Sequence, residues 1–145
     1  MPQVKDILAH KGSHVLTVSP QGSVLDAVAI MNEHRIGSVV VCERRQVVGM
    51  FTERDLLVRV VSPGLDPAQT RVRDVMTQEV VVCDIHCDID EVRTMFKERR
   101  IRHLPILDAQ SQLVGLVSIG DLNAWMIDGH EATIHHLHEY LYGRV

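Results

Sequence analysis

The stretch QVVGMFTERDL at residues 46–56 returns as QLVGLVSIGDL at residues 112–122. Between the copies the glutamine, the second valine, the glycine, the aspartate and the last leucine are identical, and Thr52 is matched by Ser118. Each copy reads as a buried strand that ends in a hydroxyl residue, with an acid three positions later. A Ser or Thr followed at that distance by an acid is typical of a capping box at a helix start. The sequence therefore predicts the same strand-to-helix junction twice.

The repeat continues upstream of this junction. VLDAVAIMNEHRIGSVVV at 24–41 aligns with IDEVRTMFKERRIRHLPI at 89–106, and VKDILA at 4–9 aligns with VRDVMT at 72–77. Such self-similarity indicates two copies of one structural unit. Each copy predicts the order strand, helix, strand, strand, helix. The expected strands are 15–18, 38–42 and 47–51 in the first copy, and 80–83, 104–107 and 113–117 in the second.

The duplication sets the expected organisation of the chain. We expect a first repeat over 4–61, a turn-rich linker over 62–71, a second repeat over 72–127 and a C-terminal helix within 128–145. In that last segment Ile134, Leu137 and Leu141 form a narrow apolar stripe, and Gly143 ends the helix. So small a sheet is not expected to bury both faces alone, so the two units should pack together and share a core. The fold class is α/β (α+β).

Composition excludes several classes of function. The net charge of −4 argues against a protein that binds nucleic acid by neutralising phosphates. No apolar run reaches the length of a membrane span, and MPQVKDILAH lacks the apolar core of a signal peptide, so we expect a cytoplasmic protein. Cys42, Cys83 and Cys87 are an odd number, which favours reduced thiols over a disulfide framework.

Tandem units that each close with G-h-h-[ST]-x-x-D, where h is apolar, resemble a pair of CBS domains, the Bateman module. The resemblance covers residues 4–127, and the phrases HRIGSVVV, VVGMFTERDL, RIRHLPI and LVGLVSIGDL are similar to those of small stand-alone bacterial CBS-pair proteins. It implies two β-α-β-β-α repeats in one pseudo-two-fold module, with a C-terminal helix as in some of those proteins. The implied function is a non-catalytic regulatory or sensor module.

The resemblance also implies the ligands and partners. Clefts between paired repeats of this family bind AMP, ADP or ATP, and in some members NAD(H) or S-adenosylmethionine; we expect AMP or ATP first. It implies a homodimer formed through the CBS helices, for which the apolar residues Leu56, Val60, Leu122 and Met126 are candidates. Any output would then pass to a separate effector protein that the sequence does not name.

Site residues follow from the same resemblance. Asp55 and Asp121 correspond to the family's ribose ligands, with Thr52 and Ser118 beside them. Thr77, at the end of VMT, corresponds to a residue that reaches the ligand of the partner repeat. The complete set expected in the first cleft is Thr52, Arg54, Asp55, Thr77, Ile101, Arg102 and His103. The set expected in the second is Ile36, Gly37, Ser38, Ser118, Gly120 and Asp121.

The chemistry of these residues suits such ligands. A carboxylate can accept both hydroxyl donors of a ribose diol, and the free N–H groups at a helix start favour phosphate. The two clefts differ in charge. Arg102 and His103 lie where the first copy has Gly37 and Ser38, and Thr77 is matched by Ala9. We therefore expect the cleft of Asp55 to take the more highly charged or more tightly bound ligand.

Three alternatives remain open. Thr52 and Asp55 could form a capping box and nothing more, which leaves a structural dimerisation or interaction module with vestigial clefts. His135, His138 and Glu139 share one face of the last helix and could hold a divalent metal, although we expect no metal site. Enzymatic motifs are missing, and Cys83 with His86 would lack an orienting third group, so we expect no catalysis.

Overall fold

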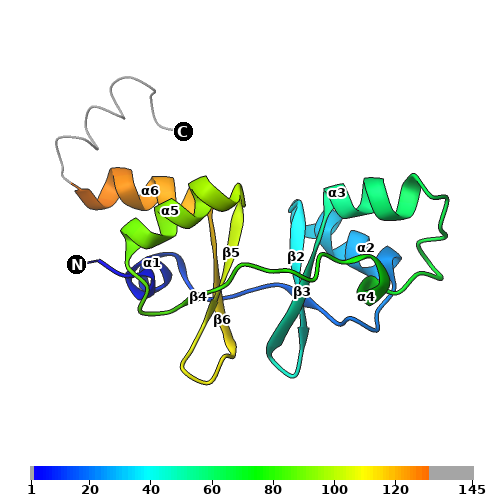
Figure 1. The fold of residues 1–145 in the computed structure, drawn as a ribbon, viewed down its shortest axis with the longest axis horizontal. Coiled ribbons are helices and arrows are strands. Elements are labelled where there is room, and N and C mark those ends of the chain that lie inside the picture. The colour runs from blue at the N-terminus through cyan, green and yellow to red at the C-terminus, as the bar shows by residue number, and fades with distance from the viewer. Residues whose placement is uncertain (1, 131–145) are drawn as a thin grey trace.

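The computed structural model describes residues 2–130, and these form two half-units side by side (Figure 1). The first copy supplies α1 Val4–Lys11, β1 Thr17–Val18, α2 Val24–His34, β2 Ser38–Glu43, β3 Gln46–Thr52 and α3 Glu53–Asp55, which continues as the π-helix Leu56–Val61. The second copy supplies α4 Val72–Val75, β4 Cys83–Asp84, α5 Ile89–Arg99, β5 His103–Leu107, β6 Leu113–Ser118 and α6 Ile119–His130. The mixed α/β fold predicted from the repeat is confirmed.

Each half-unit contains one three-stranded sheet with the same topology. The strand orders are β1-β2-β3 and β4-β5-β6, with the first pair of each sheet parallel and the second antiparallel. In the first sheet Ser38 pairs with Thr52, and in the second His103 pairs with Ser118. The register therefore brings the start of each middle strand beside the hydroxyl residue that begins the following helix.

The first helix of each copy packs on the half-unit of the other copy. In Figure 1, α1 lies beside α5 and α6, whereas α4 lies with α2 and α3. Val4, Ile7 and Leu8 belong to the core of the second half-unit, and Val72 and Val75 belong to the core of the first. The expectation of one shared core is therefore wrong, because each half-unit has its own core and the exchanged helix completes it.

The outer strands are shorter than the sequence suggests. Pairing begins only at Thr17 and Cys83, since just two residues of each outer strand reach the parallel partner. Val80 and Val81, which were expected in a strand, lie in the connection between the half-units and remain half-buried there. The apolar spacing of the long helices was a better guide: Ile89, Val92 and Phe96 are all buried.

The apolar residues named for a dimer face are mostly core residues. Val60 and Leu122 are buried, and Leu56 and Met126 pack against the two cores. The large apolar side chains that these helices expose are instead Leu57, Val58, Val61 and Ile119. The reason is that each helix lays its other face on the sheet.

Two further sequence predictions concern the C-terminal segment and membrane spans. The C-terminal helix and its metal-site alternative at His135, His138 and Glu139 lie outside the described residues. Among the helices within residues 2–130, none is both long enough and apolar enough to cross a bilayer.

Candidate functional site

A cavity of about 490 Å³, hereafter the large cavity, lies at the junction of the two half-units, where β2 and β5 begin. The first half-unit lines it with Gly37, Ser38, Met50, Thr52, Glu53 and Arg54. The connection and the second half-unit add Thr77, Glu79, Val80, Val81, Arg100, Ile101, Arg102 and His103. Apolar side chains, hydroxyl groups and three arginines therefore share one cavity, together with two carboxylates.

Asp55 lies behind this wall and is not among the lining residues. Asp55 is buried and only 5% exposed to solvent. The carboxylate oxygen Oδ2 accepts hydrogen bonds from the Thr52 backbone N–H and from the Thr52 hydroxyl, both at 3.1 Å. In return, the Asp55 N–H donates to the same hydroxyl at 3.1 Å. The predicted capping box is therefore present, and it starts α3.

Thr77 joins the connecting segment to this box. Its hydroxyl donates to both carboxylate oxygens of Asp55, at 3.0 and 3.1 Å. Its backbone exchanges two hydrogen bonds with Met50, at 2.8 and 2.9 Å. Arg59 completes the cluster: its Nε lies 3.7 Å from Asp55, and its guanidinium donates to the Met76 carbonyl at 2.8 Å. Asp55 thus fixes the segment on which the second half of the cavity wall begins.

Ser38 and His103 connect the two half-units at equivalent positions of the repeat. The Ser38 hydroxyl lies 3.3 Å from His103 Nδ1, within hydrogen-bonding distance. Burial lowers the pKa of His103, and the Arg102 guanidinium lowers it further, against an opposing effect of the Asp121 carboxylate. His103 is therefore a neutral hydrogen-bonding group near pH 7, and the positive charge of the cavity wall comes from its arginines.

Asp121, the counterpart of Asp55, has a different partner. Lys11 Nζ donates to Asp121 Oδ2 at 2.6 Å and also lies 2.7 Å from the Leu116 carbonyl. The Ser118 N–H donates to the same carboxylate at 2.8 Å, and the Ser118 hydroxyl accepts from the Asp121 N–H at 3.0 Å. A lysine from the exchanged helix therefore takes the place that Thr77 has at Asp55.

The Lys11–Asp121 pair predicts a pH effect on stability. Burial alone would raise the pKa of Asp121, but Lys11 and the Ser118 N–H outweigh it and lower the pKa. A lowered folded-state pKa gives stability that is present above the unfolded value and is lost as the pH falls through the folded value. Because the pair is partly exposed, we expect Lys11→Met to cost less than about 1 kcal/mol at neutral pH, and the cost should shrink in acid as Asp121 becomes protonated in the folded state.

Urea unfolding of wild type and Lys11→Met over this pH range measures the effect, and Asp121→Asn is the matched control. In the Asp121→Asn background the Lys11 substitution should show no such pH dependence. A difference between wild type and Lys11→Met that is the same in neutral and acidic buffer would contradict the assignment.

Comparison with known proteins identifies the family. The family model of the CBS domain matches residues 4–62 and again residues 72–128. The chain belongs to the CBS-domain family. Paired CBS domains are regulatory modules, and this chain holds one such pair.

Relatives of this CBS pair include chains of similar length. The CBS domain-containing protein YhcV of Bacillus subtilis is 36% identical over 122 residues, which are 84% of this chain and 84% of that protein. The solved CBS-domain containing protein ATU1752 from Agrobacterium tumefaciens is 37% identical, with a TM-score of 0.77 over 87% of this chain and all of that chain. An uncharacterized protein of Methanopyrus kandleri is 37% identical over 109 residues, and there the match spans only 56% of the relative.

The CBS pair brings most of the first predicted residue set around the large cavity. Thr52, Arg54, Thr77, Ile101, Arg102 and His103 line it. Asp55 does not, because its carboxylate faces Thr52 and Thr77. The Asp55 carboxylate, from which we expected a ribose contact, therefore does not face the cavity.

The second predicted set is divided between different surroundings. Gly37 and Ser38 line the large cavity, since β2 and β5 begin at the same place. Asp121 lines a separate cavity of about 270 Å³ together with Lys11 and Trp125. Ile36 packs against the core of the first half-unit, Ser118 caps α6, and Gly120 is exposed.

Sequence reasoning missed several lining residues. Arg100 ends α5 with φ 52°, a left-handed position that Arg35 shares at the end of α2 with φ 55°. That repeated helix end was the available signal for Arg100. Glu79, Val80 and Val81 were not expected because the run EVVVC resembles a strand. No local signal distinguishes a strand from an extended connection that borders a cavity.

Cys83, the candidate nucleophile of the catalytic alternative, is not activated in the described part of the chain. Burial raises the pKa of the Cys83 thiol despite an opposing hydrogen bond with Cys87. The Cys83 thiol donates to the Asp84 carbonyl at 3.3 Å. A nucleophilic cysteine requires the thiolate, which this environment disfavours. Across residues 2–130, no group of three His, Cys, Asp or Glu side chains is placed to hold a metal ion.

Proposed function

We propose that the large cavity of this CBS pair binds an adenosyl ligand and that occupancy is reported to another protein. The observation that supports this most is the composition of the cavity wall. Met50, Val80, Val81 and Ile101 provide an apolar slot suited to a flat base. Arg54, Arg100 and Arg102 provide the fixed positive charge that phosphate groups favour. The ligands we propose are AMP or ATP, with NAD(H) and S-adenosylmethionine as alternatives.

The threonines would contact the ribose, with Asp55 orienting them. The Thr52 and Thr77 hydroxyls both donate their protons to Asp55, so their oxygens keep acceptor capacity for a ribose hydroxyl. A direct ribose contact by Asp55 would require Thr77 to give up this bond. The ligand contacts predicted for Asp121, Ser118, Gly120 and Ile36 stay predictions for a second site. Lys11 at the second site is already paired with Asp121, whereas the large cavity is lined by three arginines. We therefore propose that the more highly charged ligand binds in the large cavity.

One solved protein that shares the fold of this chain carries an adenosyl ligand. The solved protein CBSX2, in complex with AMP, has a TM-score of 0.76 to this chain at 21% identity. That level of identity shows a common fold. The choice of AMP or ATP therefore rests on the three arginines of the cavity. We also propose a cytoplasmic location, where such nucleotides are abundant.

The arginines give a discriminating prediction. We expect Arg102→Gln to weaken AMP binding at least roughly tenfold, because a charge-assisted hydrogen bond to phosphate contributes about 1.5–3 kcal/mol. Adenosine, which has no phosphate, should bind wild type and Arg102→Gln equally. Calorimetric titration measures both affinities, and Arg93→Gln, an exposed arginine on α5, is the matched charge control.

A thermal-shift series with AMP, ATP, NADH and S-adenosylmethionine precedes the titrations. A ligand that binds the folded state alone must raise the melting temperature. If no compound at millimolar concentration raises it, the adenosyl proposal is wrong. Equal losses of AMP and adenosine affinity in Arg102→Gln would also oppose the assigned phosphate contact.

Exposed apolar residues on the π-helix favour a second function, which is contact with another protein. Leu57, Val58 and Val61 on the π-helix are 61%, 55% and 58% exposed, a run of apolar surface that favours contact with another protein. A homodimer through these helices, or an interaction module with vestigial clefts, would use it. The same thermal-shift series separates the two functions, because a structural dimer would gain stability with protein concentration and none with nucleotide.

A further inference from the structure

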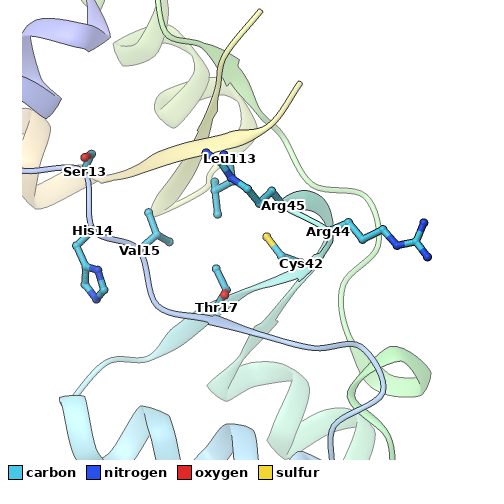
Figure 2. Close-up of a pocket in the computed structure, with 8 residues that line it drawn as sticks. All are labelled: Ser13, His14, Val15, Thr17, Cys42, Arg44, Arg45 and Leu113. Atoms are coloured by element: carbon cyan, nitrogen blue, oxygen red, sulfur yellow. The ribbon is translucent and has the colours of Figure 1, made fainter. Parts of the chain in front are cut away.

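Another cavity lies at the far end of the first hairpin, away from the junction of β2 and β5. It has a volume of about 410 Å³ and is formed where the β2–β3 turn meets the segment before β1 and the start of β6 (Figure 2). The turn is held against the second half-unit, because the Leu113 N–H donates to the Arg45 carbonyl at 2.9 Å. The pocket therefore has a fixed backbone frame built from both half-units.

Most residues that line this hairpin pocket are polar, and Val15 and Leu113 form its apolar part. Its polar side chains are Ser13, His14, Thr17, Cys42, Arg44 and Arg45. Each of these can donate a hydrogen bond, and the two arginines carry permanent charge. Within residues 2–130, no carboxylate side chain lines the pocket, although the chain has 19 acidic residues and a net charge of −4. Polar donors without any acid among them select for an anion.

The turn that carries the arginines is an unusual place for them. Arg44 and Arg45 have φ values of 53° and 64°, so both central residues of a two-residue hairpin loop are left-handed. Such a loop favours Asn-Gly, and arginine adopts these angles at a cost. The hairpin of the second copy differs, since Asp108 accepts hydrogen bonds from Gln110 and Gln112 in its loop. The basic turn is therefore a property of one copy and not a requirement of the repeated fold.

We propose that the hairpin pocket binds a small anion that carries phosphate, at a site separate from the adenosyl cavity. Arg45 lines the pocket from the fixed turn and is the main contact. In Figure 2 the Arg44 guanidinium points away from the other labelled side chains, so its part is long-range attraction. Ser13 and Thr17 also line the pocket, and each carries a hydroxyl group that can donate a hydrogen bond. A planar guanidinium matches two phosphate oxygens, which selects phosphate over chloride.

Inorganic pyrophosphate is the probe, and amide chemical shifts of the full chain are the readout. At constant ionic strength set with chloride, pyrophosphate should shift the amides of residues 13–17, 42–46 and 113 saturably. Replacing the turn by its favoured sequence, Arg44→Asn with Arg45→Gly, should weaken these shifts at least about tenfold. The same variant should melt about 3 °C higher, because the loop strain is removed.

The variant is expected to gain stability, so a loss of binding cannot be attributed to misfolding. Arg71→Gln with Arg73→Gln removes two exposed positive charges elsewhere and controls for the change in net charge. That control should bind pyrophosphate within about twofold of wild type. Unchanged binding in the Asn-Gly variant would overturn the proposal. So would pyrophosphate shifts confined to the cavity of Arg54 and Arg102, or equal losses in both double variants.

Discussion

Replacing Asp55 by alanine is expected to lower the free energy of unfolding by about 3 kcal/mol. The carboxylate is buried and accepts hydrogen bonds from the Thr52 N–H and from the hydroxyls of Thr52 and Thr77. Alanine would leave these donors without an acceptor in a place that water reaches poorly. A buried donor left unsatisfied costs more than the net contribution of the bond itself. The effect on stability should therefore appear before any ligand is added.

Asp121→Ala is the matched control, because Asp121 has the same position in the second copy. Its side chain is 27% exposed and its main partner is a lysine that is itself partly exposed. An exposed ion pair contributes little, so we expect a loss under about 1 kcal/mol. The loss of unfolding free energy for Asp55→Asn, which keeps one acceptor oxygen, should fall between the losses for Asp55→Ala and Asp121→Ala. Urea unfolding gives all three values. Equal losses for Asp55→Ala and Asp121→Ala would show that burial of the Thr52–Asp55–Thr77 cluster does not stabilise the fold.

Sequence reasoning could locate Asp55 but could not orient it. The spacing of Thr52 and Asp55 fits both a capping box and a ligand site, and the structure forms the capping box. Which way the carboxylate turns depends on Thr77, 22 positions away along the chain. A long-range hydrogen bond of this kind leaves no periodic pattern in a sequence. The family resemblance supplied eight of the fourteen residues that line the cavity, whereas Glu79, Val80, Val81 and Arg100 were among those missed. The contacts among the lining residues were not predictable.

The order of elements was predictable and the exchange of helices was not. The duplicated junctions at residues 46–56 and 112–122 fix the strand and helix that each copy contains. Both copies begin with a short apolar helix, so the sequence permits α1 to pack on either half-unit. The choice is made by packing: Leu8 fits against Gly115 in the second sheet, and Met76 fits against Gly49 in the first. Each glycine leaves room for a helix that belongs to the other copy.

The close contacts of these two glycines give a second prediction with a large expected effect on stability. A methyl group on Gly49 would lie 2.8 Å from the Thr77 carbonyl oxygen and 2.6 Å from Met76 Sδ. A backbone carbonyl cannot rotate away as a side-chain end can, so Gly49→Ala must displace the Thr77 segment. The displacement would break the paired backbone hydrogen bonds between Met50 and Thr77. Overpacking of this kind costs about 1–3 kcal/mol, and we expect the upper end of that range for Gly49→Ala.

Gly115→Ala is the control at the equivalent position, and its expected cost is nearer to 1 kcal/mol. Its added methyl group would lie 2.6 and 2.7 Å from the two terminal methyl carbons of Leu8, which can shift by a side-chain rotation. The two variants should also separate in ligand affinity. Thr77 lines the large cavity and Leu8 does not, so AMP affinity should fall in Gly49→Ala and hold in Gly115→Ala. If both variants lose stability and AMP affinity alike, the Thr77 segment does not position the cavity wall, and binding depends on the half-units as a whole.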